Sequence, residues 1–161
     1  MLAAAAPNKP LRVIYVPMSG DQGEHFEHVG RLVLAAGNIV FYVDEIDTQC
    51  SPSSLMPKRS AFWSRPENQY RTSALEEILN RGRHKGVAGV FMSRFPTQVN
   101  TTVRSQAQEM RVFRSDDPNY VKWFRDKDAR IAVLLGQLHD YEYVLAQDGR
   151  TPVIAGGRRN L

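Results

Sequence analysis

Apolar and polar positions follow two different periods along the chain, and each period predicts a type of element. Residues 11–16 and 39–43 are short apolar runs rich in β-branched and aromatic side chains, which is typical of strands. Between them, apolar residues recur at helical spacing, so we predict a helix over residues 23–36 that ends at Gly37. Because the run 39–43 contains no polar residue, it predicts a strand buried on both faces, as in a parallel sheet.

The rest of the chain continues this alternation of strands and helices. We expect a loop over residues 47–68, a helix around 75–79, a strand over 87–92, a short helix over 99–107, a strand over 111–114, helices from Asp116 and near Ile131, and strands over 141–146 and 151–154. Asp148-Gly149 predicts a hairpin between the last two strands. The pattern predicts an α/β fold, with a mostly parallel sheet flanked by helices and a C-terminal hairpin. No second domain boundary is evident, so residues 1–161 are predicted to form one domain, with residues 1–10 as a loose leader.

Composition narrows the class of protein without naming a function. With 161 residues, 42% hydrophobic and 24% charged, the chain has the size and balance of one globular domain. No apolar run approaches the roughly 20 residues of a membrane-spanning helix, and we expect a cytoplasmic protein. The only cysteine, Cys50, excludes an intrachain disulfide and a cysteine-based zinc site. The net charge of +4 is compatible with binding a phosphate backbone but does not establish it.

The most informative feature is a pair of carboxylates, Asp44 and Glu45, that follows the apolar run 39–43. A strand that ends in adjacent acids places them at the carboxyl edge of a parallel sheet, where ligands of open α/β folds bind. Such a pair could hold Mg²⁺ and orient an attacking water, because phosphoryl transfer depends on charge neutralisation and positioning. The same pair could instead solubilise the strand end or cap the next helix, and the run alone does not decide between these readings.

A second group of motifs follows this pair. A helix ends in the basic, glycine-bearing turn at residues 81–86, a strand comes next, and Ser93-Arg94-Phe95-Pro96 follows the strand. This order resembles the FtsK–HerA superfamily of DNA-pumping P-loop ATPases, and the likeness covers roughly residues 11–146. In that family Arg94 would occupy the sensor position, where glutamine is commoner, and Phe95 replaces the usual arginine.

The resemblance implies a partial RecA-like core with ATP and Mg²⁺ as cofactors. It also implies translocation or packaging of double-stranded DNA by a homo-oligomeric ring, if the motor is complete. Asp44 would hold the metal, Glu45 would position water, and Ser93 and Arg94 would sense the phosphate. Arg83 would reach a neighbouring subunit's phosphate as an arginine finger, or it would only pair with the dipole of its own helix.

One motif of the family is missing from the sequence. No G-x-x-x-x-G-K-[ST] phosphate-binding loop, or Walker A motif, occurs in it, and the glycines at 19–23 have no lysine beside them. In the family this loop lies just before the strand predicted at residues 11–16. We therefore expect the Walker B half of an ATPase, active only when joined to a Walker A segment. The alternative is a non-catalytic interaction or assembly subunit on the same core.

Overall fold

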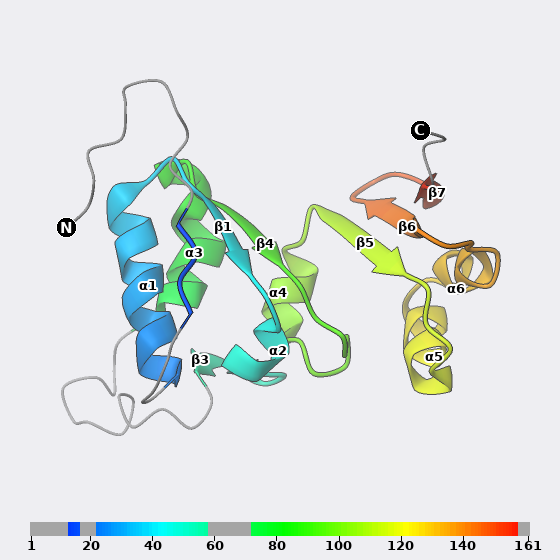
Figure 1. Cartoon of the computed structure of the whole chain (residues 1–161), viewed down its shortest axis with the longest axis horizontal. Coiled ribbons are helices and arrows are strands. Elements are labelled where there is room, and N and C mark those ends of the chain that lie inside the picture. The colour runs from blue at the N-terminus through cyan, green and yellow to red at the C-terminus, as the bar shows by residue number, and fades with distance from the viewer. Residues whose placement is uncertain (1–12, 17–21, 58–71, 158–161) are drawn as a thin grey trace.

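The computed structural model describes residues 13–16, 22–57 and 72–157, and it has an α/β fold (Figure 1). Its helices are α1 (Gln22–Ala36), α2 (Ile46–Gln49), α3 (Ala74–Arg81), the 3₁₀ helix η3 (Gly82–Lys85), α4 (Thr101–Ser105), α5 (Pro118–Lys127) and α6 (Ala129–Leu135). Its strands are β1 (Val40–Val43), β2 (Cys50–Ser51), β3 (Ser54–Pro57), β4 (Ala88–Phe91), β5 (Glu109–Phe113), β6 (Glu142–Gln147) and β7 (Val153–Gly156). The predicted fold class is confirmed. None of the helices in these ranges is long and apolar enough to cross a lipid bilayer.

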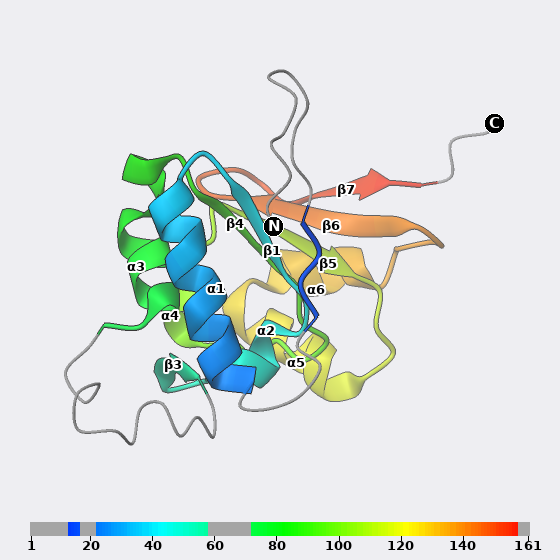
Figure 2. The same ribbon diagram turned by 60° about the vertical axis from the view of Figure 1, so that its left-hand side comes forward.

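The first half of the described chain is a parallel strand pair covered by helices. β1 and β4 run parallel, with Val40 opposite Ala88 and Val43 opposite Phe91. α1 and α3 lie side by side along this pair (Figures 1 and 2). Parallel neighbours need a long crossover connection, and α3 lies within the connection from β1 to β4.

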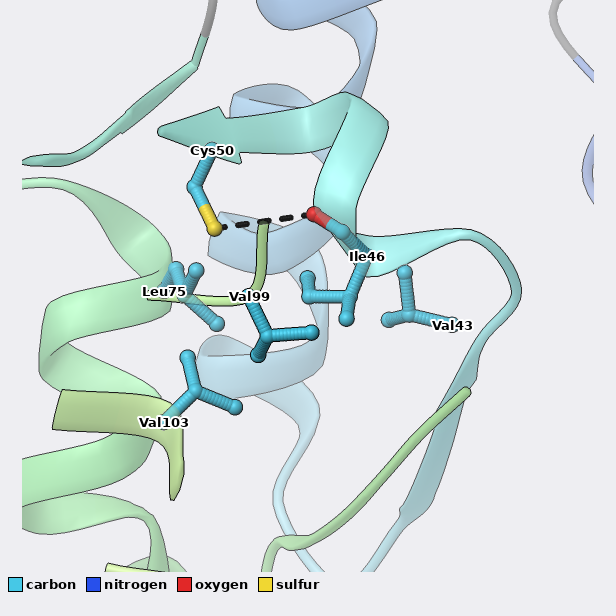
Figure 3. Close-up of a cluster of buried hydrophobic side chains, with 6 residues drawn as sticks. All are labelled: Val43, Ile46, Cys50, Leu75, Val99 and Val103. Carbon is cyan, nitrogen blue, oxygen red and sulfur yellow. Dashed lines mark hydrogen bonds between the residues drawn. The ribbon is translucent and has the colours of Figure 1, made fainter. Parts of the chain in front are cut away.

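Two clusters of buried side chains join these helices to the strand pair. One lies around α2 and the carboxyl end of β1 and contains Val43, Ile46, Cys50, Leu75, Val99 and Val103 (Figure 3). The other contains Val33, Leu34, Ala74, Ile78 and Val87. Phe41 and Phe91 pack against both clusters, so one face of the β1–β4 pair connects them.

The second half is an antiparallel sheet packed on two helices. β6 lies between β5 and β7 and pairs antiparallel with both. Buried side chains of α5 and α6 meet those of β5 and β6 in a third cluster, made of Val112, Phe124, Ile131, Leu135, Leu138 and Val144. Gly149 adopts a left-handed φ of 69° in the turn between β6 and β7, so the predicted hairpin is confirmed.

Side-chain caps explain where the helices begin. The residues before α3, α4, α5 and α6 each accept a backbone N–H of the first turn; they are Ser73, Asn100, Asp117 and Asp128. Each cap satisfies an amide that the helix itself leaves unpaired. The 3₁₀ helix η3 ends at Gly86, which has a φ of 69°. This left-handed conformation would be strained for a residue with a side chain.

A partly buried ion network ties α1 to the start of α3. The Glu27 carboxylate, 3% exposed, accepts Arg31 Nε at 2.8 Å and the Ala74 N–H at 2.8 Å. Arg31 also donates to Glu77 Oε1 at 2.5 Å and to the Thr72 carbonyl. Burial alone would lower the pKa of Arg31, but hydrogen bonds and charges from Glu77 and Glu27 raise it above its ordinary value. The carboxylate is therefore buried with partners, which is the condition for tolerating a charge inside a protein.

The strand predicted at residues 11–16 is wrong where it can be tested. Residues 13–16 belong to no sheet in the described ranges, and their side chains are exposed. β-branched residues favour an extended backbone, but a strand also needs a hydrogen-bonded neighbour. Residues 11–12 and the predicted leader 1–10 lie outside the described residues.

The prediction that β1 is buried on both faces is also wrong. Val40 and Tyr42 are 53% and 65% exposed, whereas Val43 is 7% exposed. Alternate residues of a strand point to opposite faces, so one face of β1 packs on the core and the other is open. Val90 of β4, opposite Tyr42, is exposed on the same open face.

The loop predicted over residues 47–68 contains regular structure. α2, β2 and β3 occupy residues 46–57, and β2 pairs antiparallel with β3. The sequence did not predict these elements, because elements of two to four residues are too short to show a hydrophobic period. Residues 58–68 lie outside the described residues.

α1 approaches α3 closely at Gly30. A Cβ at this position would lie 2.6 Å from the Cβ of Ala74, which is fully buried. We expect Gly30→Leu to lower the free energy of unfolding by about 1–3 kcal/mol, because overpacking forces the helices apart. Gly136→Leu is the control, since a Cβ there meets only the Val133 carbonyl oxygen, at 3.6 Å. Urea denaturation measures both variants, and equal stabilities would contradict the tight contact.

Candidate functional site

The chain segments that follow β1 and β4 lie side by side at the carboxyl edge of the strand pair. Two hydrogen bonds continue the ladder past the strands: the Met92 N–H donates to the Val43 carbonyl and the Ile46 N–H to the Met92 carbonyl, each at 2.9 Å. The predicted residues that meet at this edge are Asp44, Glu45, Ser93 and Arg94. The structure thus brings these four residues together, and their roles stay predictions.

Glu45 has a left-handed backbone, with φ 49° and ψ 50°. For a residue with a side chain this conformation costs roughly 1–2 kcal/mol. Local hydrogen bonds hold it: Asp44 Oδ1 accepts the Glu45 N–H at 2.9 Å, and the Glu45 carbonyl accepts the N–H and the hydroxyl of Thr48, each at 2.8 Å. Backbone strain of this kind concentrates at functional sites.

An exposed ion pair crosses the edge from β4 to β1. Arg94 Nη2 donates to Glu45 Oε1 at 2.7 Å, and the two side chains are 74% and 45% exposed. Exposed pairs of this kind contribute only about 0–1 kcal/mol to stability. Arg94 can therefore leave Glu45 for a stronger anion, such as a phosphate, at little cost.

A partly buried hydrogen bond lies next to this ion pair. The Ser93 hydroxyl donates to Asp47 Oδ1 at 2.5 Å and accepts the Phe95 N–H at 3.0 Å. Asp47 is only 6% exposed. Asp47 is not among the predicted site residues, because the sequence pattern marks it only as the start of a loop. The available signal was a third carboxylate, two residues after Glu45.

Arg83 lies apart from the other predicted residues. It belongs to η3, which immediately precedes β4, so it stands at the amino end of this strand. The Lys85 carbonyl fixes this end by accepting the Asn38 N–H at 2.8 Å. Asp44 and Glu45 follow the opposite, carboxyl end of the pair. Within one molecule Arg83 therefore cannot act on a ligand held by these carboxylates.

The residues at this edge fit a magnesium ion better than they fit a whole nucleotide. Among the described residues, no group of three or more His, Cys, Asp or Glu side chains is arranged around a metal position. Magnesium in nucleotide sites needs only one or two carboxylates, with phosphates and waters completing its shell. The exposed carboxylate of Asp44 meets that need. The sequence has no lysine-bearing glycine loop to bind the phosphates of a nucleotide.

The fold is that of a viral genome-packaging ATPase core. The crystal structure of B204, the DNA-packaging ATPase of Sulfolobus turreted icosahedral virus, matches with a TM-score of 0.70 at 18% identity, over 91% of this chain and 66% of that chain. The genome-packaging NTPase B204 of Sulfolobus turreted icosahedral virus 2 matches in its sulfate complex with a TM-score of 0.67 at 19% identity, over 88% and 64%. Its ATPγS complex matches with a TM-score of 0.63 at 19% identity, over 81% and 60%.

These likenesses establish a shared fold and leave the activity open. No family matches the sequence, and no curated protein matches it. The chain covers 60% to 66% of the length of the solved structures described above. What B204 binds and packages is therefore known of B204, and its transfer to this chain is a proposal.

Proposed function

We propose that the chain is the Walker B half of an FtsK–HerA-type ATPase core that hydrolyses ATP to move or package double-stranded DNA. One observation carries the proposal: two adjacent carboxylates follow β1 and stand beside Ser93 and Arg94, which follow β4. Phosphoryl transfer needs neutralised charge and a positioned water. The sheet edge offers a carboxylate for each task and a cation for the phosphate.

Each side chain at the edge has a separate task in this proposal. Asp44 anchors Mg²⁺, which supplies positive charge to the phosphates when it is bound. Glu45 orients the attacking water and accepts its proton. Arg94, which pairs with Glu45 at 2.7 Å in the structure, moves to the phosphate and so frees the Glu45 carboxylate. Ser93 holds the turn from which Arg94 projects.

The solved structures of the same fold support a nucleotide as the ligand. B204 has been solved with ATPγS, with AMP and with AMPPCP. Those structures are also longer than this chain, which covers about 60% of the one with ATPγS. A longer chain leaves room for the phosphate-binding loop that the 161 residues do not contain.

The exposed face of the β1–β4 pair is evidence that a further segment covers it. Val40, Tyr42 and Val90 are 53%, 65% and 38% exposed there. Parallel sheets are almost always covered on both faces, because their strands are apolar on both sides. We infer that the segment carrying the phosphate loop packs against this part of the sheet.

A ring assembly would give Arg83 its role. The side chain is exposed at the amino end of β4, opposite the carboxylates of its own molecule. In a ring, one subunit's exposed arginine can reach the nucleotide of the next, as arginine fingers do. The excess of positive charge, +4 overall, is compatible with a DNA substrate.

We expect the 161-residue chain alone to show no saturable ATP binding in the micromolar range, which corresponds to about 8 kcal/mol. The reason is that it lacks the backbone N–H cradle and the lysine that hold phosphates. Isothermal titration calorimetry with Mg²⁺ and ATP measures this affinity. Tight binding would show that the chain carries an unconventional phosphate loop.

The matched experiment joins the chain to an upstream strand, phosphate loop and helix of the B204 type. This joined chain should bind and hydrolyse ATP, and hydrolysis should increase when DNA is added. Its control carries alanine in place of the phosphate-loop lysine. If the joined chain folds and binds ATP but never hydrolyses it, the sheet edge is not catalytic. The chain is then better described as an assembly subunit built on the same core.

A further inference from the structure

Asp47 is a buried carboxylate next to the ion pair between Arg94 and Glu45. It is 6% exposed and lies in α2, two residues after Glu45. Burying a carboxylate is costly unless hydrogen bonds replace its water. One such bond comes from a residue distant in sequence, the Ser93 hydroxyl, at 2.5 Å from Oδ1. Asp47 thus connects the segment after β1 with the segment after β4.

The Ser93 hydroxyl has a fixed direction because an ionised carboxylate can only accept. Its hydrogen points to Asp47, and its lone pairs remain for the Phe95 N–H at 3.0 Å. One hydroxyl therefore ties down the backbone on both sides of Arg94.

Arg94 depends on that backbone for its direction. Its side chain is 74% exposed, so the protein interior does not confine it. Its described contacts are the 2.7 Å bond to Glu45 and the Phe95 ring, whose centroid lies 5.8 Å from the guanidinium carbon. With so few contacts, the Arg94 side chain keeps most of its rotamer freedom. The position of its main chain therefore decides which region the guanidinium can reach.

A second tie runs parallel to the first. The Ile46 N–H donates to the Met92 carbonyl at 2.9 Å, one position before Asp47 and Ser93 in their segments. A main-chain bond from Ile46 to Met92 and a side-chain bond between Asp47 and Ser93 therefore join α2 to the segment after β4. The main-chain tie sets the distance between the segments, and the Asp47 carboxylate sets the shape of the turn that carries Arg94.

We propose that Asp47 is a positioning residue that acts through Ser93 to hold Arg94 opposite Glu45. The inference rests on the proposed function, in which Arg94 is the group that meets the phosphate. Without the Asp47 carboxylate, the Ser93 hydroxyl rotates freely and the Phe95 amide loses its fixed acceptor. Arg94 then occupies many positions and pairs with Glu45 for only part of the time.

The first test uses the 161-residue chain and NMR. In Asp47→Ala, we expect the Phe95 amide to exchange with solvent about tenfold faster, because its acceptor is no longer held. In the unmodified chain, the bond to Glu45 should slow rotation of the Arg94 guanidinium. We expect Asp47→Ala to abolish this slowing as well. Asp47→Asn keeps an oxygen acceptor for Ser93 and should restore most of both signals. Asp126→Ala, an exposed carboxylate on α5, is the control and should change neither.

Ser93→Ala keeps the experiment decisive if Asp47→Ala fails to fold. It should reproduce both changes, and the double variant should add nothing to either single one, because both residues act through one contact. A folded Ser93→Ala protein with normal Phe95 exchange and a normal Arg94 signal would overturn the proposal. Equal acceleration of exchange at all amides of β1 and β4 would also overturn it, since that result describes general destabilisation.

The second test uses the joined chain that carries a phosphate loop. Asp47→Ala should lower kcat about tenfold and leave KM for ATP within about twofold, because it misplaces a group at the reacting phosphate. Asp47→Asn should recover most of the rate. Unchanged kcat in Asp47→Ala would overturn the positioning role. If the unmodified joined chain does not hydrolyse ATP, the proposed function fails, and the NMR result alone decides how Arg94 is held.

Discussion

Glu45→Gln should lower ATP hydrolysis by about 10²-fold or more in the chain joined to a phosphate loop, while ATP binding survives. Glutamine keeps the size and hydrogen bonding of the side chain but removes the carboxylate that orients and deprotonates water. The comparison is clean because Glu45 is 45% exposed, so the change leaves no buried group without a partner. Steady-state ATPase rates and calorimetric affinities measure the two effects separately.

Asp44→Asn should behave differently at the adjacent position. The amide cannot replace the carboxylate as an anchor for Mg²⁺, so Mg²⁺-dependent nucleotide binding itself should weaken. Asparagine keeps the side-chain oxygen that accepts the Glu45 N–H, so the local turn should be retained. Glu76→Gln on α3 serves as the control for a lost negative charge. Unchanged turnover in Glu45→Gln would reject the catalytic assignment, because these acids would then only solubilise the strand end.

Leu75→Ala should lower the free energy of unfolding by about 2–5 kcal/mol. Leu75 is fully buried between residues of α2, α4 and β1 in the cluster of Figure 3. Removing its side chain leaves a cavity in the cluster that supports the carboxyl end of β1. Because typical domains have only about 5–15 kcal/mol of stability, this loss is large.

Leu32→Ala is the matched control for this stability measurement. Leu32 belongs to α1 but is 57% exposed, so its truncation should change the free energy of unfolding by less than about 0.5 kcal/mol. Chemical denaturation of both variants, with the slope checked for two-state behaviour, gives the comparison. Similar losses in the two variants would mean that the cluster around Leu75 does not dominate this region.

Much of the fold follows from local sequence signals. The helix caps at Ser73, Asn100 and Asp117 and the turn glycines at Gly86 and Gly149 stand where short-range hydrogen bonding requires them. Such signals act within a few residues, so a single sequence reveals them. The same holds for the carboxylates after β1, because an apolar run followed by acids marks a strand and its end.

The remaining features depend on contacts between distant parts of the chain. The apolar run 39–43 shows that β1 is a strand, but it does not show that Val40 and Tyr42 are exposed on one of its faces. Asp47 resembles any polar loop residue until its contact with Ser93, 46 positions away, is known. The hydrogen-bonded pairing of β5 with β6 likewise joins segments separated by two helices. Local propensity carries no information about such pairings.

The division of the buried core has a consequence for how the chain folds. The clusters around α1, α3 and β1 draw on residues 26–103, and the cluster around α5, α6 and β5 draws on residues 110–146. Each part is contiguous in sequence, so the ribosome completes the first before it begins the second. Arg104, whose guanidinium carbon stacks 4.9 Å from the Trp123 ring centroid, is a contact between them. Because the buried clusters of the two halves share no residue, we expect the halves to unfold as separate cooperative units, which native-state hydrogen exchange would measure.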